Sequence, residues 1–433
     1  MPRSRHRGRS SRKGPGRAGK GAPVVSIEGE RLFRSAIAAL AQVAGKGDPL
    51  LVELMVSDLL GTALAATDPC DPDEDRVVEE LAGLLARRAA RERTPEALVL
   101  LRALAAAGPR KAAAGAREAA RVLAASGVVP PPGMDGIGGA AFEGAWRVTH
   151  PFGDQDAVLV AFRHPGRPPH LVSVLVDRNL GGIAKDIGVT DRPAEVLEAW
   201  RRHPEFAVEP IDVAEAAGRI RAAVGVWRLY HEPPAGDDVP ARIPFVLGRL
   251  RGVPDTWRPQ PERGWSEEER EELVEAFLAS PEARRSRQAP DVLQEVAEAG
   301  VDYLCDEGAG DPLRWNPVAV ELFLLDWCPR KLAARDEVVE GFPAALRALV
   351  RFTGRRAGLA AHLIAETTRA VDRFRWEFAE AMRDPRRFGP AKAMILAMLA
   401  EGVDVGDPEA VQRWVDDFNA RPFEERARLL PVP

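Results

Sequence analysis

Apolar residues recur at helical spacing through the first part of the chain after its N-terminal tail. Leu32, Ile37, Leu40 and Val43 form one stripe at intervals of three to five residues, which is typical of an amphipathic helix. The pattern continues with short interruptions for about a hundred residues. It predicts helices at 29–45, 50–66, 73–91, 94–107 and 109–126.

Local signals mark the ends of these predicted helices. Thr94-Pro95-Glu96 places an N-cap before a proline at the first helical position, and Gly108-Pro109 separates the last two helices. Helix pairs joined by short turns resemble HEAT-like solenoids in layout, although no strict residue repeat is present. A HEAT-like stack and a plain helical bundle both remain open for residues 25–128.

The pattern changes after a proline- and glycine-rich linker at residues 129–140. Ala157–Phe162 and Leu171–Val176 are short apolar runs on either side of a His-Pro-Gly-Arg-Pro-Pro turn, which predicts an antiparallel hairpin. Trp146–Val148 is a candidate third strand. Because the runs are continuously apolar, we expect helices at Glu195–Arg202 and Asp212–Tyr230 to cover the sheet.

A second proline- and glycine-rich stretch at 232–265 predicts a connector, interrupted by a short helix near Ile243–Leu250. Helices resume at Ser266, which forms an S-x-x-E capping-box pattern with Glu269. Further helices are predicted at 290–305, 317–327, 335–357, 361–382, 390–400 and 408–419.

These patterns predict a mostly α fold, in which two helical regions flank a small α+β segment with a short antiparallel sheet. The predicted organisation is a basic tail, a helical region, a linker, a small α+β domain, a connector and a C-terminal helical domain. Their boundaries are 1–24, 25–128, 129–140, 141–231, 232–265 and 266–433.

Composition agrees with a globular protein of this kind. Apolar residues make up 45% and charged residues 29% of the 433 positions, which is enough apolar content for a core. The three cysteines, Cys70, Cys305 and Cys328, form no CxxC pair and predict neither a disulfide framework nor a zinc ribbon. Without a secretory signal or a long apolar run, the expected location is the cytoplasm.

Charge is unevenly distributed along the chain. The tail has a charge of +8 within a chain of net charge −5, and no acidic residue precedes Glu28. Such a segment cannot bury a core, so we expect it to be disordered and able to contact nucleic-acid phosphates. A solubilising tail, or one that folds back on the acidic body, is the other interpretation. The candidate nucleic-acid-binding residues are Arg3, Arg5, Arg7, Arg9, Arg12, Lys13, Arg17 and Lys20.

Polar residues gather at the ends of the predicted strands. Carboxylates beside a glycine turn can bind a hard divalent cation, and a nearby lysine can stabilise a developing anion. Under the hypothesis of such a cation site, His150 and Lys185 are the candidate catalytic residues. The candidate metal ligands are Asp154, Asp156, Asp177 and Asp186. The alternative is that these residues are ordinary turn-makers, because their side chains satisfy local backbone groups.

Other polar residues point less clearly to function. Arg347, Arg351, Arg355 and Arg356 nearly share one helical face, which fits an anionic partner or a solvated face paired with nearby glutamates. His164, His170 and His203 have neither HExxH nor HxH context, so we expect them in loops or at the surface.

Three stretches of this chain resemble segments of a protein family of GC-rich bacteria for which no activity is established. They are Trp315–Lys331, Phe388–Ala393 and Val176–Asp186, within a likeness that covers about two-thirds of the chain. The resemblance therefore implies no catalytic residues and no cofactor.

Together these features predict a non-enzymatic helical interaction or scaffold protein with a protein partner, associated with nucleic acid through its tail. No cofactor is predicted for that function. The alternative is a metal-dependent hydrolase or nuclease, in which the four aspartates converge on one divalent metal.

Overall fold

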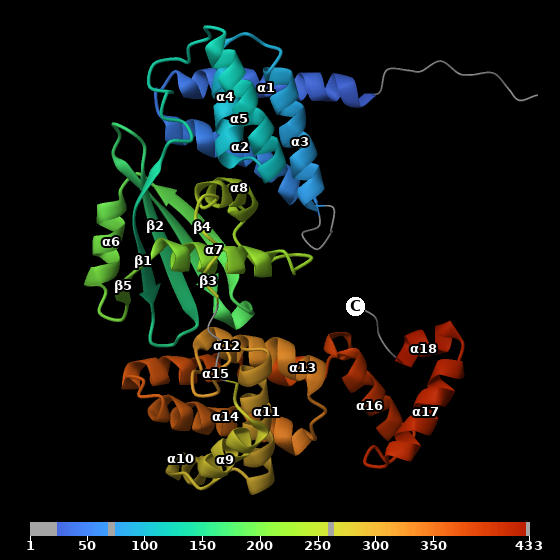
Figure 1. Cartoon of the computed structure of the whole chain (residues 1–433). Helices are drawn as coiled ribbons and strands as arrows, with labels where there is room; N and C mark the ends of the chain where they lie inside the picture. Colours follow the sequence, from blue (N-terminus) through green and yellow to red (C-terminus); the bar gives the residue numbers. More distant parts are fainter. Residues whose placement is uncertain (1–23, 68–73, 259–263, 430–433) are drawn as a thin grey trace, which may run out of the picture.

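The protein is mostly α-helical, with two helical regions on either side of a five-stranded antiparallel sheet (Figure 1). This confirms the predicted fold class. The computed structural model describes residues 24–67, 74–258 and 264–429. The candidate residues of the basic tail lie outside these ranges.

The N-terminal helical region is a bundle of five helices. Thr94 accepts a hydrogen bond from the Ala97 backbone N–H, as its predicted N-cap role requires. The first helix contacts the fourth as well as the second, so helices that are not sequence neighbours also meet. The five helices are α1 (Val24–Ala44), α2 (Pro49–Ala65), α3 (Glu74–Ala89), α4 (Pro95–Ala107) and α5 (Arg110–Ala125).

The sheet has the strand order β4-β3-β2-β1-β5. The predicted hairpin is formed by β2 and β3, with Ala161 opposite Leu171. Gly166 lies in the connecting turn with a positive φ of 69°, a conformation that favours glycine. The strands are β1 (Ala141–Thr149), β2 (Gln155–Arg163), β3 (Pro169–Asp177), β4 (Ile183–Thr190) and β5 (Ala207–Ile211).

Both edge strands were absent from the sequence prediction. In β4 the polar pair Lys185 and Asp186 interrupts the apolar pattern, yet the strand pairs with β3 along almost its whole length. In β5 Pro210 argues against a strand, but an edge position tolerates proline because one side of the strand needs no ladder hydrogen bond.

Helices cover both faces of the sheet. α6 (Pro193–Arg202) lies on one face, and α7 (Val213–Trp227) with α8 (Val239–Arg249) lies on the other (Figure 1). The larger core runs without a break from the N-terminal bundle across α7 and α8 to the sheet. The N-terminal bundle and the sheet therefore share one apolar core.

α2 and α8 pack unusually closely, and this contact joins the bundle to the sheet. A Cβ added at Gly61 would lie 2.4 Å from the Ala241 Cα, so only glycine fits there. The Ser57 hydroxyl forms two hydrogen bonds with the backbone of α8. It accepts one from the Phe245 N–H at 2.9 Å and donates one to the Ala241 carbonyl at 2.6 Å. It thereby replaces a helical hydrogen bond next to Pro244.

The C-terminal helices build a separate core around the buried aromatic residues Trp315, Phe323 and Phe342. The capping box at Ser266 and Glu269 forms as predicted. α16 to α18 lie to one side of the other helices, with a small core of their own (Figure 1). The helices are α9 (Glu267–Leu278), α10 (Pro281–Ser286), α11 (Pro290–Asp306), α12 (Pro317–Leu322), α13 (Cys328–Lys331), α14 (Asp336–Arg356), α15 (Ala361–Ala381), α16 (Pro390–Ala400), α17 (Pro408–Ala420) and α18 (Phe423–Leu429).

Candidate functional site

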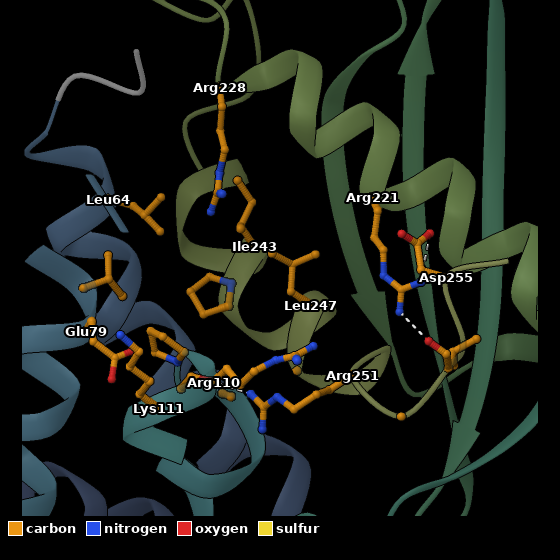
Figure 2. A pocket seen from close by; sticks show the side chains of 18 of the residues that line it. Leu64, Glu79, Arg110, Lys111, Arg221, Arg228, Ile243, Leu247, Arg251 and Asp255 are labelled. Carbon is orange, nitrogen blue, oxygen red and sulfur yellow. Dashed lines mark hydrogen bonds and ion pairs between the residues drawn. The ribbon is translucent and has the colours of Figure 1, made fainter. Parts of the chain in front are cut away.

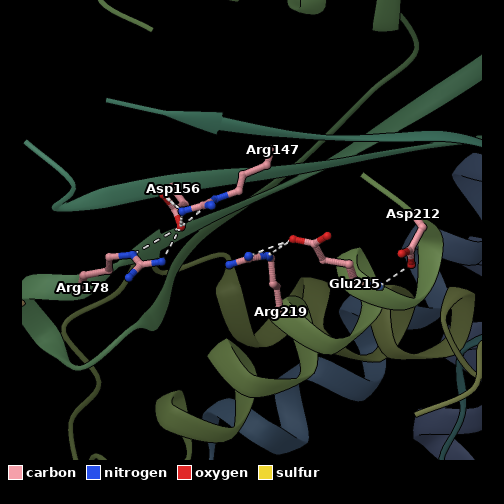
Figure 3. Close-up of polar contacts among 6 residues, drawn as sticks. All are labelled: Arg147, Asp156, Arg178, Asp212, Glu215 and Arg219. Carbon is pink, nitrogen blue, oxygen red and sulfur yellow. Dashed lines mark hydrogen bonds and ion pairs between the residues drawn. The ribbon is translucent and has the colours of Figure 1, made fainter. Parts of the chain in front are cut away.

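Asp156, a predicted metal ligand, is held between two arginines. It lies on β2 with only 3% of its surface exposed. Arg147 of β1 and Arg178, which follows β3, each place an Nη2 atom 2.9 Å from its Oδ2 (Figure 3). The same view shows a separate pair on α7, in which Arg219 contacts Glu215 at 2.8 Å. The Asp156 carboxylate is thus neutralised by two guanidinium groups.

Asp177, at the end of β3, is fully buried and also engaged by its neighbours. Its Oδ1 accepts from the Asn179 backbone N–H at 3.1 Å, and its Oδ2 accepts from the Lys185 ammonium at 2.8 Å. The Gln155 amide donates to the same Oδ2 at 3.3 Å. Lys185, a predicted catalytic residue, therefore serves as the ion-pair partner of Asp177.

The other two aspartates do not join them in a metal site. Burial raises the pKa of Asp154, in the turn before β2, whereas Asp186 is exposed on the edge strand β4. Within the described ranges, no group of three or more histidine, cysteine, aspartate or glutamate residues is placed to hold a metal ion. The predicted ligand set is therefore not assembled there, because arginine, lysine and backbone groups occupy the two buried carboxylates.

His150, a predicted catalytic residue, lies where the sheet meets the C-terminal helices. Its ring makes tilted contacts with Phe152 and Phe206, whose ring centroids are 4.9 and 5.1 Å away. Its Nε2 is 3.5 Å from a carboxylate oxygen of Glu205, which also accepts a hydrogen bond from His362 of α15. That bond from His362 outweighs partial burial and lowers the pKa of Glu205. His150 thus belongs to a contact that joins the two parts of the molecule.

A cavity of about 780 Å³ opens beside His150, between the sheet and the C-terminal helices. Arg314 crosses this joint by donating to the Pro151 carbonyl at 2.8 Å, and it also pairs with Asp311 at 3.0 Å. The charges that line the cavity are largely matched. They comprise Arg147, Arg178 and Arg314 against Asp156, Glu205, Glu209 and Asp311.

A buried polar network that the sequence did not reveal lies between α2, the sheet and α8. Glu53 is fully buried, and one of its oxygens accepts from the Gly138 N–H at 2.7 Å. Its other oxygen contacts Arg249 and lies 3.1 Å from the His164 Nε2. His170 stacks on His164 with a centroid distance of 5.2 Å. His164 lies in the turn between β2 and β3 and His203 is exposed, as predicted, but His164 is only 2% exposed. His170 lies on β3 and is also 2% exposed, so its predicted place in a loop or at the surface is wrong.

Electrostatics in this network favour a charged glutamate and a neutral histidine. Burial opposes ionisation of Glu53, but the hydrogen bond from His164 and the positive charge of Arg249 outweigh it and lower the pKa. Burial, with the nearby charge of Arg249, lowers the pKa of His170 to about 3. These groups are closely packed and partnered, which indicates a role in stability.

A larger cleft, of about 1140 Å³, lies between the N-terminal bundle and the pair α7 and α8 (Figure 2). Its floor is apolar and includes Leu64, Ile243 and Leu247, whereas its walls are mainly basic. We name it the basic cleft. Its basic lining residues are Arg76, Arg110, Lys111, Arg221, Arg228 and Arg251, and its acidic ones are Glu79 and Asp255.

Arg251 lies in the basic cleft without a carboxylate partner among the described residues. Its guanidinium donates to the carbonyl of Ala105 at 2.7 Å and to that of Gly108, at the end of α4. Burial, together with the positive charges of Arg117 and Arg110, lowers the pKa of Arg251. No described carboxylate therefore compensates the positive charge of Arg251.

Two further cations line the cleft at the start of α5. Arg110 and Lys111 are exposed, and neither forms an ion pair with any residue that the structure describes. The preceding Pro109 provides no side-chain cap, and the first turn contains no acidic residue. Cations at this end of a helix are disfavoured by the macrodipole, so stability alone does not account for their placement.

Two of the four arginines of the predicted face on α14 form ion pairs with described residues. Arg347 contacts Asp372, and Arg355 lies 2.8 Å from Glu282. Arg351 lines a small cavity of about 240 Å³ between α10 and α14 and forms no ion pair within the described residues. Arg351 and Arg356 remain unpaired among the described residues, against three such cations in the basic cleft.

Comparisons with known proteins add no information about function. No family model, curated protein or solved structure matches the chain. In the described ranges, none of the helices combines the length and the apolar character required to cross a membrane.

Proposed function

We propose that the protein is a non-enzymatic interaction or scaffold protein that binds an acidic segment of a protein partner in the basic cleft. The observation that carries this proposal is a set of basic side chains around an apolar floor that have no carboxylate partner among the described residues, Arg110, Lys111 and Arg251. An amphipathic segment matches such a surface, because its apolar side covers the floor while its carboxylates meet the walls.

The lining of the cleft favours a protein segment over a nucleic-acid strand. Single-stranded nucleic acids are held by aromatic side chains that stack on bases, and none of the described residues that line the cleft is aromatic. Association with nucleic acid through the basic tail remains a separate prediction. The two kinds of partner can be distinguished with the same full-length protein.

The side chains that acid–base catalysis would use are already engaged by other residues. Their engagement supports a binding function over a catalytic one. The Asp156 and Asp177 carboxylates lie within 3 Å of arginine or lysine nitrogens, and His150 contacts Glu205 at the joint. Arg110, Lys111 and Arg251, by contrast, have no carboxylate partner among the described residues, so they can form ion pairs with an anionic partner.

Fluorescence anisotropy with two labelled probes tests the proposal. One probe is an acidic amphipathic peptide of glutamate and leucine, and the other is a single-stranded DNA of similar charge. The variant Arg110→Glu/Lys111→Glu should bind the peptide at least about thirtyfold more weakly, since two contacts of about 1 kcal/mol each are lost. Raising the salt concentration should weaken wild-type binding.

The control variant Arg369→Glu/Arg373→Glu makes the same change in net charge on exposed residues of α15. It should retain wild-type affinity for the peptide. Equal losses in both variants would mean that overall charge, rather than the cleft, attracts the peptide. A larger loss for DNA than for the peptide would show that the cleft is a nucleic-acid site and would overturn the proposal.

A further inference from the structure

We propose that the acidic partner is a second copy of this chain, which presents an acidic face of α9 and α11 to the basic cleft. This inference rests on the proposed function, because it identifies the partner of the same cleft. The acidic face and the basic cleft lie in two different parts of the molecule.

The acidic face begins with a stripe along α9. Glu267, Glu271 and Glu275 recur every four residues, so they lie on one side of the helix, and all three are exposed. The stripe is about 12 Å long at the helical rise per residue. None of the three forms an ion pair with a described residue. Like charges at this spacing repel one another, so the stripe weakens the isolated helix.

α11 contributes the second wall of this face. Glu298 and Asp302 face the stripe across a groove of about 870 Å³. Its floor is apolar, formed by Val274, Leu278 and Val301. We define the acidic face as these five carboxylate residues and the apolar floor between them.

The acidic face and the basic cleft are complementary in charge and in polarity. Three basic residues of the cleft have no carboxylate partner among the described residues, namely Arg110, Lys111 and Arg251. In the groove Asp302 pairs with Arg270 at 3.2 Å, whereas the three glutamates of the α9 stripe have no ion-pair partner among the described residues. Each surface has an apolar floor that a docked helix would cover. This match favours the chain itself as partner, since one molecule carries both halves of the contact.

The acidic face of one copy does not contact the basic cleft of the same copy. The cleft lies between the N-terminal bundle and α8, whereas α9 lies among the C-terminal helices, on the other side of the sheet (Figure 1). The contact must then join two copies head to tail. A contact of this kind uses different surfaces on the two partners, and it produces rings or open chains.

Sedimentation velocity over a concentration series, at low and high salt, tests the inference. Wild-type protein should associate at low salt and dissociate as salt rises. The cleft variant Arg110→Glu/Lys111→Glu and the face variant Glu271→Lys/Glu275→Lys should each associate at least tenfold more weakly. Mixed in equal amounts, the two variants should associate again, because each supplies the surface that the other lacks.

Two control variants separate the contact from general charge effects. Arg369→Glu/Arg373→Glu carries the same charge change as the cleft variant, and Glu366→Lys/Glu377→Lys carries that of the face variant. All four residues are exposed on α15. Both controls should associate as the wild type does.

Three outcomes would overturn the inference. The first is a wild-type protein that stays monomeric at low salt. The second is a mixture of cleft and face variants that fails to associate. The third is association that disappears when the tail arginines alone are changed to glutamine. If the wild type stays monomeric yet its cleft still binds the acidic peptide, the proposed function stands and only the identity of the partner is wrong.

Discussion

Replacing Glu53 by glutamine should destabilise the protein far more than the same change at its surface. Glutamine keeps the size of the side chain and still offers an oxygen to the Gly138 N–H. It removes the negative charge that faces Arg249, whose side chain is only 6% exposed. The variant therefore leaves a buried guanidinium without its carboxylate.

The size of the effect follows from the burial of both partners. Removing one member of a buried ion pair typically costs about 3–5 kcal/mol, because the remaining charge is desolvated and uncompensated. Glu53 is fully buried and also contacts His164, so the loss should lie within that range. Such a change is a large part of the stability of a typical domain.

Urea unfolding followed by tryptophan fluorescence measures this loss. Trp227 is buried in the core shared by the bundle and the sheet, so it reports on the part of the molecule that contains the network. The double variant Glu53→Gln/Arg249→Met should be more stable than Glu53→Gln alone, because it removes the orphaned charge. The surface control is Glu118→Gln, which affects an exposed pair with Arg121.

Two results would refute this reasoning. One is a loss for Glu53→Gln no larger than that for Glu118→Gln. The other is a double variant that is less stable than Glu53→Gln, since the charge of Arg249 would then not be the source of the destabilisation. Either result would mean that packing, and not charge compensation, dominates this network.

Two further predictions concern other buried groups. Since the pKa of His170 is lowered to about 3, the unfolded chain takes up a proton below pH ~6.5 that the folded protein excludes. Stability should therefore fall by about 1.4 kcal/mol per pH unit as the pH drops from 6.5 to 5, and His170→Gln should remove that contribution in urea unfolding at several pH values. Asp156→Asn leaves Arg147 and Arg178 without their shared carboxylate and should cost about 3 kcal/mol in the same assay, whereas unchanged stability would argue against a structural role for Asp156.

Local signals allowed most of the helices to be predicted from the sequence. Thr94, Asp212 and Ser266 each accept a hydrogen bond from a backbone N–H in the first turn of the helix that they precede. These interactions involve residues only three positions apart, so they are visible in the sequence. The central hairpin was predictable for the same reason, because its two strands are separated by one short turn.

The buried network could not be predicted, because its parts come from distant positions. His164 lies 111 residues from Glu53, and Arg249 lies 85 residues from His164. The loop sequence around His164 is rich in proline and glycine and indicates a surface turn. It is buried only because α2 and α8 pack over the end of the hairpin, a tertiary contact with no local signature.

The candidate site residues illustrate the same limit. Asp156 and Asp177 were recognised as unusual polar residues at strand ends, but their partners decide their role. Arg147 faces Asp156 because β1 and β2 pair in a particular register, and Lys185 reaches Asp177 from a strand that was not predicted. A carboxylate in the sequence thus predicts a charge, and the fold determines whether that charge is paired.

The molecule has two kinds of charged region, which differ in whether the charged side chains form ion pairs with one another. In the buried network and at the strand ends, each engaged carboxylate meets a cation, so the charges contribute to stability without an external partner. In the basic cleft Arg251 meets only carbonyl oxygens, and Arg110 and Lys111 add positive charge at the start of α5, where the macrodipole opposes it. Such an arrangement lowers the stability of the isolated molecule, and an anionic partner would offset that cost. The stability of the folded protein should therefore rise in the presence of the acidic peptide, by an amount that disappears in the Arg110→Glu/Lys111→Glu variant.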